Sequence, residues 1–212
     1  RGGTPRAGAV GTHAAMGPLG PEVERRVLAQ LGLGAPDPVD SKGSQDVFAE
    51  FGAALAIAAR GFQRLAQEVF LLQGDDFGEL SIRNPAVGSS TMPHKVNPTL
   101  CVEIMSRAPE VSALLPVLLD WVVTIHERDS AIHAGTVEQM CLDFAQLVSC
   151  AEAMIQNLVV HPEAMRTNLG RTRGAIMTEA LTVALAERLG RRSAHERMRE
   201  IVQRMTREGL SL

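Results

Sequence analysis

The segment QDVFAEFGAALAIAARGFQRLAQEVFLLQ, residues 45–73, decides the predicted fold of this chain. Its apolar side chains recur every three or four residues, which is the spacing of a stripe along one face of an α-helix. The stripe consists of Val47, Phe51, Ala54, Leu55, Ala58, Phe62, Leu65, Val69 and Leu72. At 1.5 Å per residue such a helix is about 40 Å long. A helix of this length is unusual in a compact globule, so the segment predicts a long helix bundle.

Two more long helices are predicted downstream of this segment. The first runs over residues 98–128 and contains Pro109 and Pro116, each of which removes a backbone donor and should bend the helix. The second runs over residues 135–159 and has the same three-and-four spacing of apolar residues. Both helices are long enough to pack along the first one. The sequence therefore predicts an all-α fold built around a bundle of long helices.

The pattern changes after residue 160, where the predicted helices become short. They cover residues 162–169, 175–189 and 194–208. Ser193 with Glu196 three residues later predicts a capping box at the start of the last of them. We therefore expect two domains: a central helix-bundle domain over residues 1–160, incomplete at its N-terminus, and a small C-terminal helical domain over residues 161–212.

The composition of the chain agrees with a helical protein and excludes several classes of function. Aromatic residues make up 3% of the 212 residues and Tyr is absent, whereas a β-sandwich would need more aromatic and β-branched residues. The net charge is −3, without the basic face that nucleic-acid binding requires. No apolar run is long enough for a membrane span. We expect no nucleic-acid partner and no membrane partner.

The cysteines and the first residues bear on location and completeness. The three cysteines, Cys101, Cys141 and Cys150, have no metal-ligand spacing, and an odd, sparse set argues against a secreted disulfide scaffold. We therefore expect a cytoplasmic protein with no bound metal. The chain begins with Arg1 rather than Met, so we also expect it to be a piece of a longer protein.

The stretch GSSTMPHKVNP, residues 88–98, is the segment most able to carry chemistry. It lies in a long Gly- and Pro-rich loop over residues 74–98, and long loops in helical proteins tend to be functional. Hydroxyl groups and Lys95 precede Asn97, a good N-cap, and Pro98, which suits the first helical position. A helix N-terminus favours anions, so the loop predicts a carboxylate-binding site.

This stretch resembles the GSSxMPxKxN signature of the fumarase/aspartase superfamily of lyases. His94 before the lysine is similar to the branch that contains adenylosuccinate lyase and 3-carboxy-cis,cis-muconate cycloisomerase. Residues 8–12 (GAVGT), 125–129 (IHERD) and 174–179 (GAIMTE) resemble other segments of the same branch, so the resemblance covers nearly the whole chain. It implies the all-α fold of that superfamily and a β-elimination activity.

The resemblance also implies roles for individual residues. Ser89 would be the general base that removes a proton next to a carboxylate, and Lys95 would stabilise the resulting aci-carboxylate. A serine hydroxyl is a poor base in water, so a closed loop must exclude solvent around it. No cofactor is implied. The residues expected to bind substrate are Ser90, Thr91, Met92, His94, Asn97 and Gln45.

The chain departs from the branch pattern at several positions. The general acid of the family lies in an upstream segment that this sequence does not contain. Val102 stands where many members have a Glu, with Glu103 one residue later. Gly135 and Gln139 stand where adenylosuccinate lyases hold the nucleotide phosphate, and neither can grip a phosphate as an Arg does. A small dicarboxylate or tricarboxylate substrate therefore fits at least as well as a nucleotide.

Alternative functions remain open at this point. The leading hypothesis is a lyase that releases fumarate from a succinyl-type compound, or catalyses the reverse addition. The second is cycloisomerase chemistry on a carboxymuconate, and the third is a non-catalytic homologue that kept the fold. The resemblance implies a homotetramer with active sites shared between subunits. His161 and His195 are predicted to be surface residues at helix starts.

Overall fold

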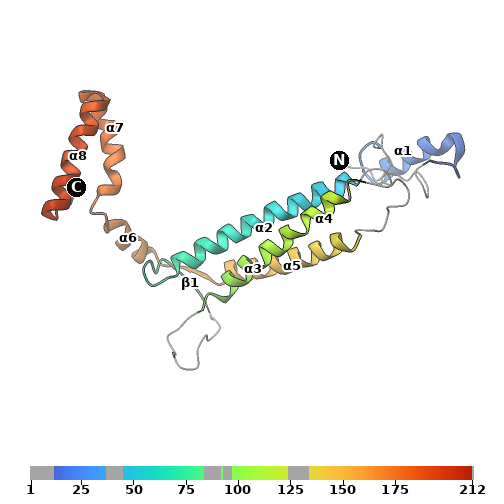
Figure 1. The fold of residues 1–212 in the computed structure, drawn as a ribbon, viewed down its shortest axis with the longest axis horizontal. Helices are drawn as coiled ribbons and strands as arrows, with labels where there is room; N and C mark the ends of the chain where they lie inside the picture. Colours follow the sequence, from blue (N-terminus) through green and yellow to red (C-terminus); the bar gives the residue numbers. More distant parts are fainter. Residues whose placement is uncertain (1–11, 37–44, 84–91, 93–96, 124–133, 212) are drawn as a thin grey trace. The chain divides into compact units, whose positions relative to one another are not determined.

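The computed structural model describes residues 12–36, 45–83, 92, 97–123 and 134–211 (Figure 1). Within these residues the chain is almost entirely helical, so the predicted all-α fold is confirmed. The helices are α1 (Gly20–Gln30), α2 (Asp46–Leu72), α3 (Thr99–Ala113), α4 (Leu115–Asp120), α5 (Ala134–Gln156), α6 (Pro162–Gly170), α7 (Thr178–Leu189) and α8 (Arg191–Glu208). Short 3-10 turns, η1 (Gly17–Leu19) and η3 (Ala175–Met177), precede α1 and α7.

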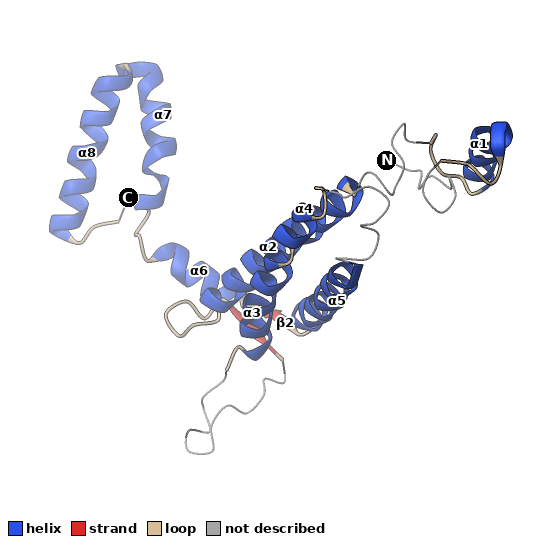
Figure 2. Cartoon of the chain, turned by 45° about the vertical axis from the view of Figure 1, so that its right-hand side comes forward, coloured by secondary structure: helices blue, strands red, loops and turns tan. Residues whose placement is uncertain are grey.

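The central bundle is formed by α2, α3, α4 and α5, which lie side by side in both ribbon views (Figures 1 and 2). The long helix predicted over residues 45–73 is present as α2. Its buried face, however, is not the predicted apolar stripe. The buried residues of α2 are Ala49, Gly52, Ala56, Ala59, Ala66 and Val69. Val69 belongs to both sets, and Phe62 of the stripe lies against Phe144 of α5 with ring centroids 6.3 Å apart.

Contacts between α2 and its neighbours show how close this approach is. A Cβ placed on Gly52 would lie 2.4 Å from Cδ1 of Leu118 on α4 and 3.3 Å from Sδ of Met140 on α5. At one end of the bundle, the rings of Phe48 and Trp121 stack with centroids 5.0 Å apart. Gly52 is therefore a position of α2 at which an added side chain would overlap α4.

The helix predicted over residues 98–128 is divided in the structure. The chain stays helical through Pro109 and breaks at Leu114, just before Pro116 in the first turn of α4. This is where proline is best tolerated, because the first turn has no intrahelical acceptor for its N–H groups. Helices α3 and α5 enclose the core, whose buried members are Cys101, Ile104, Ala108, Val111, Met140, Leu147, Ala151 and Met154.

A short antiparallel ribbon lies where the sequence predicted only loop and helix (Figure 2). Strand β1 (Leu80–Ile82) lies in the predicted loop, and strand β2 (Leu158–Val160) follows α5 directly. The register pairs Leu80 with Val160 and Ile82 with Leu158. Segments of three residues are too short to show a periodicity, which explains why the sequence analysis missed them.

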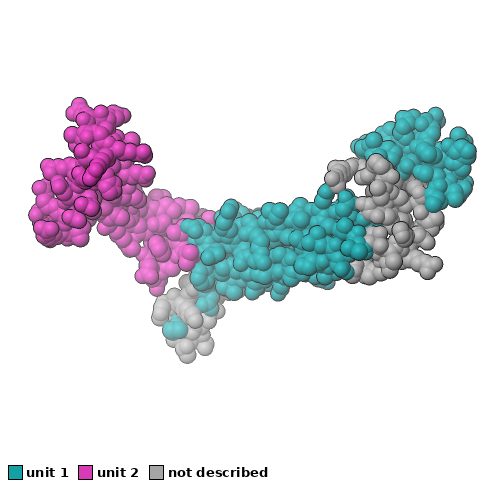
Figure 3. Space-filling view, turned by 45° about the horizontal axis from the view of Figure 1, so that its top comes forward, with its two compact units in different colours: residues 1–70, 84–157 teal, residues 71–83, 158–212 magenta. Residues whose placement is uncertain are grey.

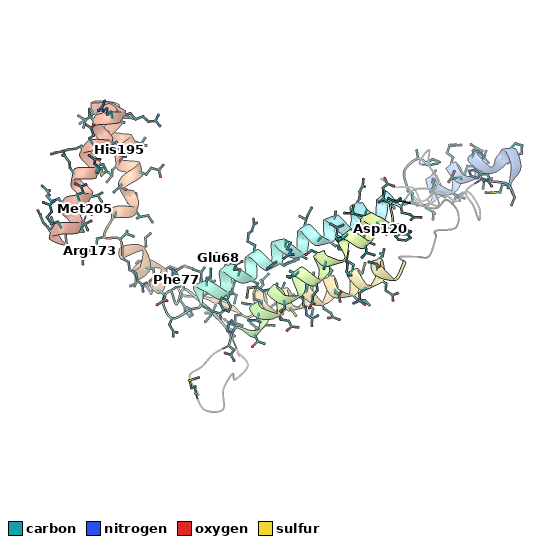
Figure 4. The ribbon with its side chains drawn as sticks, viewed as in Figure 1. Glu68, Phe77, Asp120, Arg173, His195 and Met205 are labelled. Carbon is teal, nitrogen blue, oxygen red and sulfur yellow. The ribbon has the colours of Figure 1, made fainter. Side chains whose placement is uncertain are left out.

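The C-terminal region contains α6 and the paired helices α7 and α8. The predicted capping box is wrong, because α8 begins at Arg191 and is preceded by Gly190 with φ of +76°, without a side-chain cap. Arg173 donates a hydrogen bond to the carbonyl of Gly209 at 2.6 Å and so ties the turn before α7 to the end of α8. Figure 4 labels Arg173 and the buried Met205 in this region.

The chain divides into two compact units (Figure 3). The first comprises residues 1–70 and 84–157, and the second comprises residues 71–83 and 158–212. The ribbon of β1 and β2 belongs to the second unit, so residues 71–83 group with the C-terminal region rather than with the bundle. The proposed domains, 1–160 and 161–212, stay a prediction. Among the described helices, none has the length and apolar character needed to cross a membrane.

Two glycines of α2 allow a matched test of the bundle packing. Gly52→Ala should lower the free energy of unfolding by about 1–2 kcal/mol, because the new methyl group overpacks the buried Leu118. Gly61→Ala should raise it by about 0.5–1 kcal/mol, because no described atom lies within 4 Å of its added Cβ and Ala is the better helix former. Urea denaturation of both variants measures the difference, and equal stabilisation by the two would contradict the packing at Gly52.

Candidate active site

The structure describes only part of the predicted site. Ser89, Ser90, Thr91, His94 and Lys95 lie outside the described residues. Met92, Asn97 and Gln45 are described. The geometry available is therefore that of the elements on either side of the signature stretch: strand β1 before it and helix α3 after it.

Helix α3 begins one residue later than the sequence predicted. Pro98 is the N-cap, with φ of −77° and ψ of 58°, and the first helical residue is Thr99. Asn97 is therefore not the N-cap; its carbonyl accepts hydrogen bonds from the Thr99 N–H at 2.8 Å and the Thr99 hydroxyl at 3.3 Å. Because proline has no side-chain acceptor, it leaves the first-turn N–H groups of α3 uncapped by the N-cap side chain. Such a helix start favours a bound anion.

The second turn of α3 carries an ion pair next to Val102, the position that departs from the family pattern. The Glu103 carboxylate lies 2.6 Å from Nη2 and 2.8 Å from Nε of Arg107. Arg107 also donates to Oε1 of Gln146 on α5 at 2.6 Å. The hydrogen bond that Arg107 donates to the Glu103 carboxylate raises the pKa of Arg107 above its ordinary value. Glu103 is thus engaged within the bundle, while Val102 is 48% exposed.

Gln45, Gln139 and Met92, which the sequence analysis connects with the substrate, have different surroundings. Gln45 is buried, with 3% of its surface exposed, and lies just before α2, where its carbonyl accepts the N–H of Phe48 at 3.1 Å. Gln139 on α5 donates to the carboxylate of Asp143 at 2.8 Å on an exposed surface. Met92 is exposed. The assignment of Gln45, Met92 and Asn97 to substrate binding stays a prediction.

A polar cluster that the sequence analysis missed lies at strand β1, which precedes the signature stretch in the sequence. Oγ of Ser81 on β1 lies 2.8 Å from Nε2 of His161, and both are partly buried. His161 does precede α6 as predicted, but its ring contacts the strand rather than solvent. The Asn168 amide donates to Oε1 of Glu79 at 2.7 Å. No sequence signal marks this pairing, because the residues are about 80 positions apart.

Another buried polar pair lies before the bundle. Nε2 of His13 is 3.4 Å from Oε2 of Glu24, and Glu24 is buried. His13 has φ of +54° and packs directly on Gly20, where a Cβ would lie 2.4 Å from its own Cβ. These contacts give His13 a structural role in the turn before α1. Among the described residues, no group of three or more His, Cys, Asp or Glu side chains could hold a metal ion.

The fold defines a class: all-α proteins in which long helices are packed in a fumarase-type bundle. Over 97% of the chain, the structure superposes on the crystal structure of a fumarate lyase from Mesorhizobium sp. BNC1 with a TM-score of 0.76 and 26% sequence identity. The chain covers 46% of that protein.

The chain belongs to the lyase family whose members make up the fumarase/aspartase superfamily, and residues 4–112 match that family. It is 33% identical over 205 residues to a 3-carboxy-cis,cis-muconate cycloisomerase of Pseudomonas aeruginosa, covering 93% of this chain and 44% of that protein. It is also 33% identical over 215 residues to an adenylosuccinate lyase of Pyrococcus abyssi, covering 97% of this chain and 47% of that protein. The predicted superfamily is confirmed, and the chain spans about half the length of these curated relatives.

Proposed function

We propose that the protein to which this chain belongs catalyses β-elimination on a succinyl-type carboxylate and releases fumarate, or runs the reverse addition. The observation that carries the proposal is the complete GSSxMPxKxN motif, residues 88–97, directly before the N-terminus of α3. A protein without this motif would lack the base, Ser89, and the cation, Lys95, that the proposed reaction needs. The matching lyase and cycloisomerase relatives support the same class of chemistry.

In the proposed reaction Ser89, as an alkoxide, accepts the proton from the carbon next to a substrate carboxylate. The electron pair of the broken C–H bond moves into that carboxylate and gives an aci-carboxylate. Lys95 and the amide groups at the start of α3 stabilise the added negative charge. The pair then returns to form the C=C bond as the leaving group departs, and an acid from a segment outside these 212 residues protonates the leaving group. The reaction needs proton transfer and electrostatics from the protein, with no cofactor.

The substrate is proposed to be a small dicarboxylate or tricarboxylate. Gly135 and Gln139 stand at the positions expected to hold a nucleotide phosphate, and the Gln139 amide is bonded to Asp143. An uncharged amide that already has a carboxylate partner is a weak phosphate ligand. A succinyl compound with a small leaving group is therefore favoured, and cycloisomerase chemistry on a carboxymuconate is the second candidate. The departure at these two positions favours both over adenylosuccinate.

We also propose a homotetramer with shared active sites. Large apolar side chains of the predicted stripe on α2 are exposed in the single chain, including Val47 at 45%, Phe51 at 45% and Leu65 at 42%. Leaving such a row in water is costly, whereas packing it against the helices of other subunits would bury it. The face predicted to be apolar from the sequence is then an intersubunit face rather than the core of one chain.

Replacement of the proposed base tests the function directly. Ser89→Ala in the full-length protein should lower kcat by about 10³-fold, which is the range expected for loss of a general base. The measurement follows fumarate formation from adenylosuccinate, argininosuccinate and aspartate, and the loss of carboxymuconate, by ultraviolet absorbance. Ser112→Ala is the matched control, because its hydroxyl bonds only the Ala108 carbonyl within α3 among the described residues.

The outcomes of this assay separate the candidate functions. Fumarate formation that depends on Ser89 supports β-elimination, and the substrate consumed identifies the leaving group. Carboxymuconate loss without fumarate would support the cycloisomerase instead. A folded wild-type protein that is inactive on every substrate would favour the non-catalytic homologue and remove the role assigned to Ser89.

The ion pair on α3 gives a further prediction about the acid step. Glu103→Gln should change kcat by less than about threefold, because its carboxylate is engaged with Arg107 and is not available to assist a general acid. The same fumarate assay measures it, with Ser89→Ala as the inactive reference. A loss of two orders of magnitude or more for Glu103→Gln would show instead that Glu103 takes part in proton transfer.

A further inference from the structure

Strand β1 and Glu79 directly before it precede the signature stretch in the sequence and are hydrogen-bonded by the side chains of His161 and Asn168. Both residues belong to the second segment of the same compact unit. Strand β1 ends at Ile82, seven residues before Ser89. Successive side chains of a strand point to opposite faces, so Leu80 and Ile82 share one face and Ser81 lies on the other. Leu80 and Ile82 are each 9% exposed. The buried face is therefore apolar, and the opposite face presents a single hydroxyl at its centre.

This hydroxyl meets a histidine that the register of the ribbon places beside it. Because Ser81 is opposite Val159, His161 is its diagonal neighbour on the same face. Oγ of Ser81 lies 2.8 Å from Nε2 of His161. The backbone N–H of His161 also donates to the carbonyl of Glu79 at 2.9 Å, which extends the ladder past β2. His161 thus makes two hydrogen bonds to this segment: its backbone bonds Glu79, and its ring bonds Ser81.

Helix α6 adds a second connection at the start of the strand. The Asn168 amide donates to the Phe77 carbonyl at 2.8 Å and to Oε1 of Glu79 at 2.7 Å. His161 is itself the N-cap of α6, so both connections originate from one short helix and the residue before it. The position of β1 is therefore set by α6 through side chains, in addition to its few ladder bonds.

Such side-chain connections matter because the ribbon is short. Two strands of three residues are marginal by themselves in water. A slip of one residue would turn Ser81 toward the buried face and shift the following chain by about 3.3 Å. The bond between Ser81 and His161 can form only in the observed register, since a slipped strand would present Leu80 or Ile82 to the imidazole.

We propose that Ser81 and His161 are positioning residues for the proposed elimination: their hydrogen bond fixes the register of β1 and hence the point from which the chain runs to Ser89. The inference rests on the proposed function, in which Ser89 is the base. Neither residue is assigned a contact with substrate. Their loss should therefore displace the base without removing substrate-binding groups, which lowers kcat more than it changes KM.

The test compares Ser81→Ala, His161→Phe and the double variant in the full-length protein. Each single change should lower kcat by about tenfold, because small displacements of a catalytic group cost one to two orders of magnitude. KM should stay within about twofold, and the double variant should be no slower than the singles, because both remove the same bond. His161→Gln, which keeps a polar group able to bond Ser81, should recover most of kcat. Ser112→Ala and His195→Phe, at an exposed histidine of α8, are matched controls.

Hydrogen–deuterium exchange of residues 80–82 and 158–161 provides a readout that does not need activity. Exchange should be about fivefold faster in Ser81→Ala and His161→Phe than in the wild type and unchanged in the controls. Unchanged exchange would overturn the register role, and faster exchange with an unaltered kcat would overturn the positioning role. A wild-type protein inactive on every substrate overturns the proposed function and the positioning role with it, and the exchange rates then decide the register role alone.

Discussion

The close contact at Gly52 constrains how α2 packs against Leu118 of α4 and Met140 of α5. Gly52 leaves no room for a side chain between its backbone and Leu118 and Met140. Most of the buried residues of α2 are small: Ala49, Gly52, Ala56, Ala59 and Ala66. The larger apolar residues of the same helix are displaced to other faces, where one chain alone leaves several of them exposed. The buried residues of α2 are therefore mostly small, and several of its large apolar residues are exposed in the single chain.

The signature stretch lies between β1 and α3 in the sequence. After it, the chain enters α3, whose residues Cys101, Ile104 and Ala108 are buried in the bundle core. Before it, the chain leaves β1, which belongs to the second compact unit and is bonded to His161. In the sequence, the proposed base Ser89 thus lies between β1 of the second unit and α3 of the first. Helix α3 is held by buried packing, and strand β1 by directional hydrogen bonds. Supports of this kind are needed wherever a protein must present a side chain accurately.

Membership of the lyase family and the departures from its pattern bear on different questions. The match over residues 4–112 and the superposition on a fumarate lyase define the family and the fold. The departures concern the substrate and the acid. Glu103 is committed to Arg107, and Gln139 to Asp143, so two side chains near the family's usual acid and phosphate positions already have partners. The proposal of a small carboxylate substrate therefore depends on these local departures and not on membership of the family.

The sequence by itself determined the helical class, the extent of α2 and α5 and the superfamily, because a long period and an ordered motif are properties of consecutive residues. It did not determine the buried face of α2, since its apolar residues occur on more than one face and the choice depends on which helices approach. The break at Leu114, the start of α3 at Thr99 and the missing capping box at Ser193 depended on local competition between neighbouring residues. Only the tertiary structure paired β1 with β2 and Ser81 with His161, because hydrogen bonds between residues about 80 positions apart leave no periodic signal in the chain.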